Sequence, residues 1–292
     1  MGVPGFVVQL FRQAPDKRQL MRSLALGGKG GNRTTTSVDG TELSIRQTGE
    51  GDPLVLVHGS LDGIGAFSLV ELRLAEDYSV WVYDRRGRGD SGDSGDSAEY
   101  ALDRELDDLR AVITATGSVP HVVAHSYGAV IALQARLSGV PMRSLVVYEP
   151  PINGEAIDPQ QIADIQLAVD DGRIDDAIRD MSNRLAGITD DELAIAMKVP
   201  PIRKSLREGA RVVGREIEAI RTCDWSALPV TDVPTLILRG ERSDAAVYPT
   251  DDQTSGIASS AEITTLTGQG HLGHVFAPSA FATTVLEFAD RH

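Results

Sequence analysis

Short runs of apolar residues recur through most of the chain and set its predicted architecture. They occupy residues 53–59, 79–84, 121–126, 144–150 and 235–240, and a more polar run follows at 262–268. Runs of this length, rich in Val, Ile and Leu, are typical of strands buried on both faces of a parallel sheet. We therefore predict six sheet strands, preceded by an opening hairpin within residues 41–52.

Segments with helical spacing of apolar residues separate these strands. They cover residues 66–76, 102–116, 128–137 and 278–291. Strands that alternate with helices of this length favour a sheet with helices on both faces. We predict an α/β fold with a doubly wound, mostly parallel sheet.

The stretch between residues 151 and 231 breaks this alternation. It contains helical patterns only, at 159–171, 173–186, 189–198 and 202–220. About 80 residues of helix between two strands are far more than an ordinary connection needs. We predict a helical cap inserted before the penultimate strand, over the carboxyl ends of the strands, where such sheets place their sites. The sheet domain then comprises residues 37–150 and 232–292.

The first 36 residues form a predicted N-terminal extension. One short amphipathic helix is expected over residues 7–26, followed by a glycine-rich stretch. That stretch superficially suggests a phosphate-binding loop, but Lys29 is followed by Gly30, where such a loop has Ser or Thr. We interpret it as a flexible joint.

Composition and charge narrow the classes of partner. The chain has 292 residues, 41% of them apolar, and a net charge of −14. An acidic protein is repelled by nucleic acid and by anionic membranes, so neither is expected as a partner. A single cysteine, Cys223, excludes an intrachain disulfide, and no apolar run approaches the ~20 residues of a membrane span. We expect a cytoplasmic protein that acts on a small molecule; the sequence leaves its oligomeric state open.

Ser126 stands at the strongest local signal for chemistry. It follows an apolar strand and precedes a helix that begins with small residues. A serine on such a tight turn is pushed outward, with its hydroxyl at the top of the sheet. Small residues, Ala124 and Gly128, lie two positions to either side, with Ala124 where glycine is usual. We predict that Ser126 is a nucleophile and that the backbone N–H of Tyr127 binds an oxyanion.

A second segment, His58-Gly59-Ser60, ends the first buried run. Glycine permits a sharp turn there, and we predict that the N–H of Ser60 is the second oxyanion donor. We expect His58 to bond to the backbone at the edge of the pocket. Residues 84–92 alternate glycines with charged residues. We interpret them as a structural loop in which Asp84 pairs with neighbouring arginines.

Five segments in this order resemble the α/β-hydrolase superfamily, in its lidded esterase/haloperoxidase-like branch. They are residues 58–60, 84–92, 124–128, 236–244 and 268–271. The resemblance covers about residue 38 to the C-terminus. It implies the α/β-hydrolase fold, the chain order serine, acid, histidine, and catalysis without a cofactor.

The resemblance implies that His271 is the general base, since it lies between glycines just after the last strand. His125 and His274 are expected to line the pocket. A metal pair with His274 lacks carboxylate support in the local sequence, so no metal is expected.

The acid has two candidates. Asp244 follows the penultimate strand, the usual place in the family, but stands one residue later than is common. Glu149 ends the preceding strand, where some branches of the family carry the acid. We favour Asp244 and retain Glu149 as the alternative.

Serine at the nucleophile position argues against epoxide hydrolase and haloalkane dehalogenase chemistry, which use aspartate in this superfamily. We predict a hydrolase of an ester, thioester, lactone or related acyl or C–C bond, acting through an acyl-enzyme on a small, apolar molecule. The alternatives are a non-hydrolytic enzyme of the same fold, such as a lyase or cofactor-independent oxygenase, and a slow-turnover ligand receptor.

Overall fold

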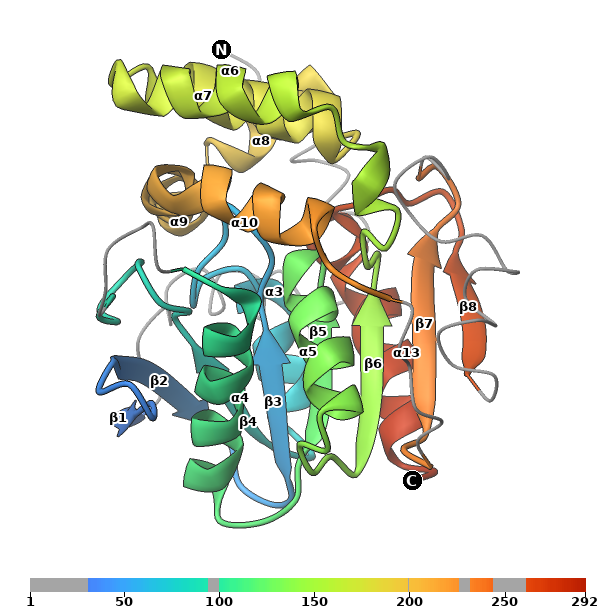
Figure 1. The fold of residues 1–292 in the computed structure, drawn as a ribbon. Helices are drawn as coiled ribbons and strands as arrows, with labels where there is room; N and C mark the ends of the chain where they lie inside the picture. The colour runs from blue at the N-terminus through green and yellow to red at the C-terminus, as the bar shows by residue number, and fades with distance from the viewer. Residues whose placement is uncertain (1–30, 94–99, 199, 226–231, 244–260) are drawn as a thin grey trace.

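A sheet of eight strands forms the centre of the molecule (Figure 1), in the order β1-β2-β4-β3-β5-β6-β7-β8. The computed structural model describes residues 31–93, 100–198, 200–225, 232–243 and 261–292, and the statements below concern these. Strands β3 to β8 are parallel to one another, whereas β1 and β2 are antiparallel to their neighbours. The strands are β1 (Gly31–Thr36), β2 (Glu42–Thr48), β3 (Pro53–Val57), β4 (Ser79–Tyr83), β5 (His121–His125), β6 (Ser144–Tyr148), β7 (Thr235–Gly240) and β8 (Glu262–Leu266). All six predicted sheet strands are therefore confirmed.

The opening hairpin differs from the prediction. It is formed by β1 and β2 around a turn at residues 37–41, in which Gly40 has a φ of 87°. The last six residues of the predicted extension, 31–36, thus belong to the sheet. Three consecutive threonines favour a strand there, and the glycines before them masked that signal. The predicted helix at residues 7–26 lies outside the described residues.

Helices cover both faces of the sheet, as predicted. One face carries α4 (Leu102–Thr116) and α5 (Tyr127–Leu137), and the other carries α3 (Ser68–Leu74) and α13 (Pro278–Ala289). Alternate residues of β3 enter two separate apolar cores: Val55 and Val57 pack on the α5 side, Leu54 and Leu56 on the α3 side. This two-sided burial explains why the strands are apolar without alternation. Among the described residues, no helix has the length and apolarity needed to span a membrane.

Helices alone fill the described connection between β6 and β7. They are η2 (Gly154–Ala156), α6 (Pro159–Asp170), α7 (Ile174–Asp180), η3 (Met181–Leu185), α8 (Asp190–Ala196), α9 (Pro200–Gly209), η4 (Ala210–Val212) and α10 (Val213–Arg221). We call residues 154–221 the cap. Figure 1 shows it above the carboxyl ends of the parallel strands. Its apolar residues Ile162, Ile165, Met181 and Leu185 are buried in the same core as α5, so they pack the cap onto the sheet domain.

One predicted helix, 202–220, is broken into α9 and α10. The break lies at Gly209, where an added Cβ would stand 2.5 Å from the Cα of Leu61. The cap backbone therefore lies directly against the loop that follows β3. Periodicity along the cap could not reveal this contact, because it depends on a residue about 150 positions away.

Buried ion pairs join the cap to the sheet domain. Glu216 of α10 pairs with both Arg85 and Arg88, which follow β4, and Arg85 also pairs with Glu105 of α4 at 3.2 Å. All four side chains are almost completely buried. Two cations face two anions, so the cluster is neutral and its charges compensate one another in a low-dielectric environment.

The structure corrects the partners predicted for this loop. Asp84 does not bond to the arginines; its carboxylate accepts the backbone N–H of Ile64 at 2.7 Å and of Asp90 at 3.4 Å. Arg86 pairs with Asp108 of α4 at 2.7 Å. The carboxylates that neutralise the arginines therefore come from other elements, namely α4, α10 and the β1–β2 turn with Asp39. Asp84 instead binds backbone N–H groups of its own loop and of the loop after β3.

Glu216→Gln tests the ion-pair cluster. Removing one partner of a buried pair leaves uncompensated charge, so we expect the free energy of unfolding to fall by about 3–5 kcal/mol. Urea denaturation followed by circular dichroism measures this. The matched control is Glu218→Gln on the same helix, whose exposed pair with Arg221 is expected to contribute less than about 1 kcal/mol. Equal losses in the two variants would contradict the role given to Glu216.

Candidate active site

Ser126 occupies a strained turn between β5 and α5. Its φ of 54° and ψ of −124° lie in a region that non-glycine residues rarely adopt. Such a conformation costs of order 1–3 kcal/mol and persists only where surrounding contacts impose it. One of these contacts is the Ser126 N–H donating to the Tyr148 carbonyl at 2.9 Å.

Two glycines allow the backbone to close around this turn. A Cβ on Gly128 would stand 2.5 Å from the carbonyl oxygens of both Val57 and His58. A Cβ on Gly59 would stand 2.9 Å from the Cβ of Ser126. The small residues flagged by the sequence at 59 and 128 are thus required by contact between the ends of β3 and β5. Ala124, in place of the usual glycine, is fully buried within β5.

The two predicted oxyanion donors lie on either side of this contact. Ser60 follows Gly59 on the turn after β3, and its N–H has no acceptor within the described part of the chain. Tyr127 is the first residue of α5, and N–H groups in a helix's first turn have no intrahelical acceptor. Both N–H groups are therefore available at the end of the sheet that carries Ser126.

His271 is placed by the loop that follows β8. Its ring is buried, and its Nδ1 lies 3.5 Å from Oε2 of Glu149. The hydroxyl of Tyr148 donates to the carbonyl of Gly270 and accepts the N–H of Gly273 at 3.1 Å, so it holds the loop on both sides of His271. The sequence did not indicate this role for Tyr148, because a tyrosine within a strand gives no pattern from which two hydrogen bonds to a distant loop can be predicted.

Glu149 directly follows β6 and is completely buried. Like Ser126 it has a positive φ, 56°, and its Oε1 accepts the N–H of Gly240 at 2.6 Å. Burial acts to raise the pKa of Glu149, but the hydrogen bond and charge of His271, with the Gly240 N–H, outweigh it. The net pKa lies below its ordinary value, so the carboxylate is ionised at neutral pH. The other candidate acid, Asp244, lies outside the described residues.

The pKa of His271 is also lowered. Burial is the largest cause and His125 adds to it, while the nearby Glu149 carboxylate acts in the opposite direction. The net pKa lies below the ordinary imidazole value of 6.5. The ring is therefore mainly neutral at pH 7, the state a general base requires.

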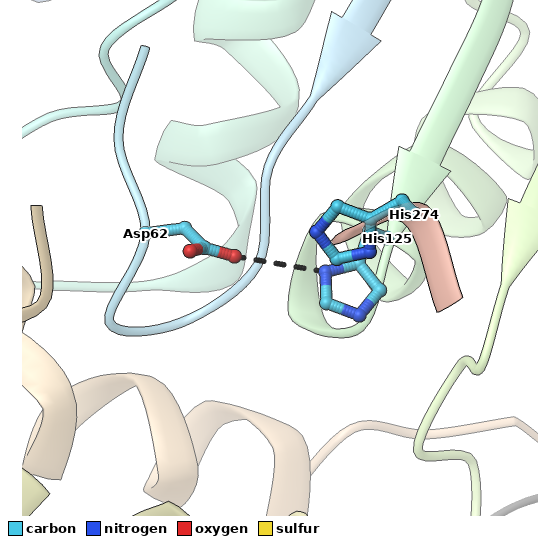
Figure 2. A group of neighbouring side chains, drawn as sticks. All are labelled: Asp62, His125 and His274. Atoms are coloured by element: carbon cyan, nitrogen blue, oxygen red, sulfur yellow. Dashed lines mark ion pairs between the residues drawn. The ribbon is translucent and has the colours of Figure 1, made fainter. Parts of the chain in front are cut away.

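A cluster of His125, His274 and Asp62 adjoins this site (Figure 2). His125 ends β5, His274 lies in α12 (Gly273–Phe276), and Asp62 lies on the loop after β3. The ring of His125 is 4.4 Å from that of His274 and 4.6 Å from that of His271, centroid to centroid. Its Nδ1 is 3.6 Å from Oδ2 of Asp62. Both histidines were singled out from the sequence; Asp62 was not, since no motif surrounds it.

His58 has the contacts of a structural histidine. Its Nδ1 donates to the carbonyl of Gly59 at 2.9 Å, and its Nε2 accepts the N–H of Arg85 at 3.2 Å. The ring is fully buried, and burial holds its pKa well below the ordinary value. Both ring nitrogens are thus engaged by the backbone of two turns, which leaves none for a ligand in the predicted pocket.

Comparison with known proteins matches the chain to one family. The sequence profile of the alpha/beta hydrolase family matches residues 54–284. An alpha/beta hydrolase of known structure from Sphaerobacter thermophilus is 31% identical, with a TM-score of 0.74 over 88% of this chain and 99% of that chain. An enol-lactonase from Burkholderia xenovorans has a TM-score of 0.69 at 18% identity, covering 88% of this chain and 99% of that one; this likeness concerns the fold alone.

Curated relatives match over shorter stretches. The N-formylmaleamate deformylase of Pseudomonas putida is 33% identical over 127 residues, which make up 43% of this chain and 46% of that protein. The matched stretch thus spans about half the length of this relative.

Proposed function

Because this chain belongs to the alpha/beta hydrolase family and is an enzyme of the hydrolase type, we propose that it cleaves an acyl bond through Ser126, His271 and Glu149. The observation that carries this proposal is the buried pair between His271 Nδ1 and Glu149, at the strand ends that also present Ser126. A carboxylate that accepts from Nδ1 leaves the lone pair on Nε2, the nitrogen that can take a serine proton.

The proposed reaction has two halves. Ser126 Oγ attacks the substrate's carbonyl carbon while His271 accepts its proton, and the N–H groups of Ser60 and Tyr127 hold the oxyanion. The tetrahedral intermediate then collapses, the bond to the leaving group breaks, and His271 gives that group the proton. Water repeats the sequence on the acyl-enzyme and releases the acid. The carboxylate of Glu149 offsets the charge of the imidazolium in both halves.

The hydroxyl of Ser126 makes no hydrogen bond within the described part of the chain. Hydrogen bonds between nucleophile and base are often long in free enzymes and tighten when substrate binds. What supports the assignment is the turn itself: backbone strain at a non-glycine residue, imposed by two close glycine contacts, gathers at functional sites.

Glu149 is proposed as the acid in preference to Asp244. Its support is the contact with His271 and the anchoring of its second oxygen by the Gly240 N–H. We propose a small ester, lactone or amide as substrate, and a curated relative named as a deformylase supports an acyl bond of this kind. These bonds pass through the same kind of tetrahedral intermediate, so one site can serve any of them.

Ser126→Ala tests the nucleophile. We expect hydrolysis of p-nitrophenyl esters to fall about 10³-fold or more, and labelling by a fluorophosphonate to vanish, because both need the serine oxygen. Ser138→Ala, at the other end of α5, is the matched control and should keep both. A folded wild-type protein that neither turns over esters nor reacts with the label would contradict the proposal.

Paired substitutions test the acid. Glu149→Gln is expected to lower kcat by about 10⁴-fold, since loss of the carboxylate removes the control of the His271 tautomer. Asp244→Asn is expected to keep kcat within a few-fold of wild type. Steady-state ester kinetics on both variants give the comparison, and the reverse ranking would transfer the acid role to Asp244.

The pH dependence of kcat/KM tests the base. The neutral form of His271 is required, so activity should fall as the pH drops through its pKa, with a midpoint below 6.5. The Glu149 carboxylate acts to raise that pKa, so the acid limb of Glu149→Gln should lie at still lower pH. The profiles are measured in buffer with EDTA. An acid limb at or above 6.5 in the wild type is the result that would contradict a buried neutral base.

A further inference from the structure

One ring nitrogen of His125, one of His274 and one carboxylate oxygen of Asp62 lie within 4.8 Å of one another. They come from three separate elements: the end of β5, α12 and the loop after β3. Figure 2 shows the three side chains pointing toward one another. Both histidines are almost completely buried, whereas the Asp62 side chain is 15% exposed, so solvent reaches the cluster from the Asp62 side.

Hydrogen bonding fixes what His125 presents to this cluster. Its Nε2 lies 3.0 Å from the carbonyl oxygen of His271, which can only accept, so Nε2 carries the hydrogen. The Nδ1 of a neutral ring then carries a lone pair, and it faces the Asp62 carboxylate at 3.6 Å, beyond hydrogen-bond distance. In this tautomer, the lone pair of Nδ1 and the Asp62 carboxylate face the same space.

His274 adds a second unpartnered nitrogen. Its Nδ1 is buried and has no hydrogen-bond partner within the described residues. Buried polar atoms are rarely left in this state, and each such atom requires an explanation. One positive ion among the three groups would bind the unpartnered Nδ1 of His125, one ring nitrogen of His274 and the Asp62 carboxylate at once.

We propose that Asp62, His125 and His274 form a binding site for a divalent transition-metal ion of the zinc type. Two imidazoles and a carboxylate are a donor set that Zn²⁺ accepts, and three protein ligands leave its fourth position for water or a substrate oxygen. The bond from His125 Nε2 to a backbone carbonyl is the second contact that metal-binding histidines usually make. The carboxylate that the local sequence did not offer beside His274 comes from a loop more than 200 residues away.

The backbone on the Nδ1 side of His125 is held close to the ring. Gly59 lies beside it, and an added Cβ there would stand 3.3 Å from Nδ1. Leu61, next to Asp62, has a φ of 60°, and the cap backbone at Gly209 packs onto it. The loop that carries Asp62 is therefore held in place by the cap, which presents the carboxylate in a fixed position.

Zinc binding by the purified full chain, stripped with EDTA and dialysed, tests the site directly. Isothermal titration with Zn²⁺ and the visible spectrum of added Co²⁺ provide two readouts that do not use activity. We expect about one Zn²⁺ per chain, and Mg²⁺ not to compete, because Mg²⁺ prefers oxygen ligands. Asp62→Asn and His274→Leu should each weaken binding more than about 100-fold, since even partners outside the coordination shell change affinity 10–100-fold.

Matched controls separate this site from other carboxylates and histidines. Asp52→Asn, at an exposed position, and His121→Gln, at the opposite end of β5, should bind Zn²⁺ like the wild type. Ser126→Ala should also bind normally, so a failure of the proposed hydrolysis would leave this result intact. Asp62→Asn lies on a partly exposed loop and its fold is checked by circular dichroism, so it decides the test even if His274→Leu does not fold.

Two results would overturn the proposal. One is a wild-type chain that takes up no Zn²⁺. The other is unchanged affinity in Asp62→Asn. Either result would mean that the three side chains pack together without binding a metal ion.

Discussion

The close approach of three adjacent strand ends is the constraint on which the rest of the site depends. Strands β3, β5 and β6 are neighbours in the sheet, and each is followed by a non-glycine residue with positive φ: Leu61, Ser126 and Glu149. Each costs of order 1–3 kcal/mol, so the surrounding structure must impose all three. Gly59 and Gly128 make this possible, because side chains at either position would collide with the neighbouring turn. The same crowding that strains the backbone brings the proposed nucleophile, acid and oxyanion donors together.

Burial and mutual contact determine the charge states of His271 and Glu149 in this crowded region. His271 and Glu149 are both removed from water, and burial shifts each of their pKa values toward the uncharged form. Their mutual contact opposes the shift, and it prevails for the carboxylate but not for the imidazole. The result is an ionised carboxylate beside a neutral imidazole, the charge states that the proposed acid and base require. A more exposed pair would have ordinary pKa values and less control over which nitrogen carries the proton.

The sequence alone predicted the features that depend on local residue patterns. Apolar runs located the parallel strands, and the serine between small residues located the turn at Ser126. Contacts between distant segments left no local pattern. The glycines that precede β1 concealed that strand in the sequence pattern. A predicted helix is interrupted at Gly209, where the cap contacts the loop after β3. Asp62 lies in no recognisable motif, and only the folded structure places it beside His125. Family position favoured Asp244 as the acid, whereas only the geometry of β6 showed that Glu149 reaches His271.

Arg85 connects the cap to the chemistry at the strand ends. Its guanidinium pairs with Glu216 of the cap, donates to the carbonyl of Gly59 at 3.3 Å, and lies 4.7 Å from the centre of the Tyr127 ring. It therefore contacts the cap and both turns that carry the proposed oxyanion donors. If Arg85 moved away, the buried carboxylate of Glu216 would lose part of its compensating charge. The position of the cap is therefore coupled to that of the turns that carry the proposed oxyanion donors. A substrate that displaces the cap would therefore have to disturb the same charges that hold the proposed oxyanion turns.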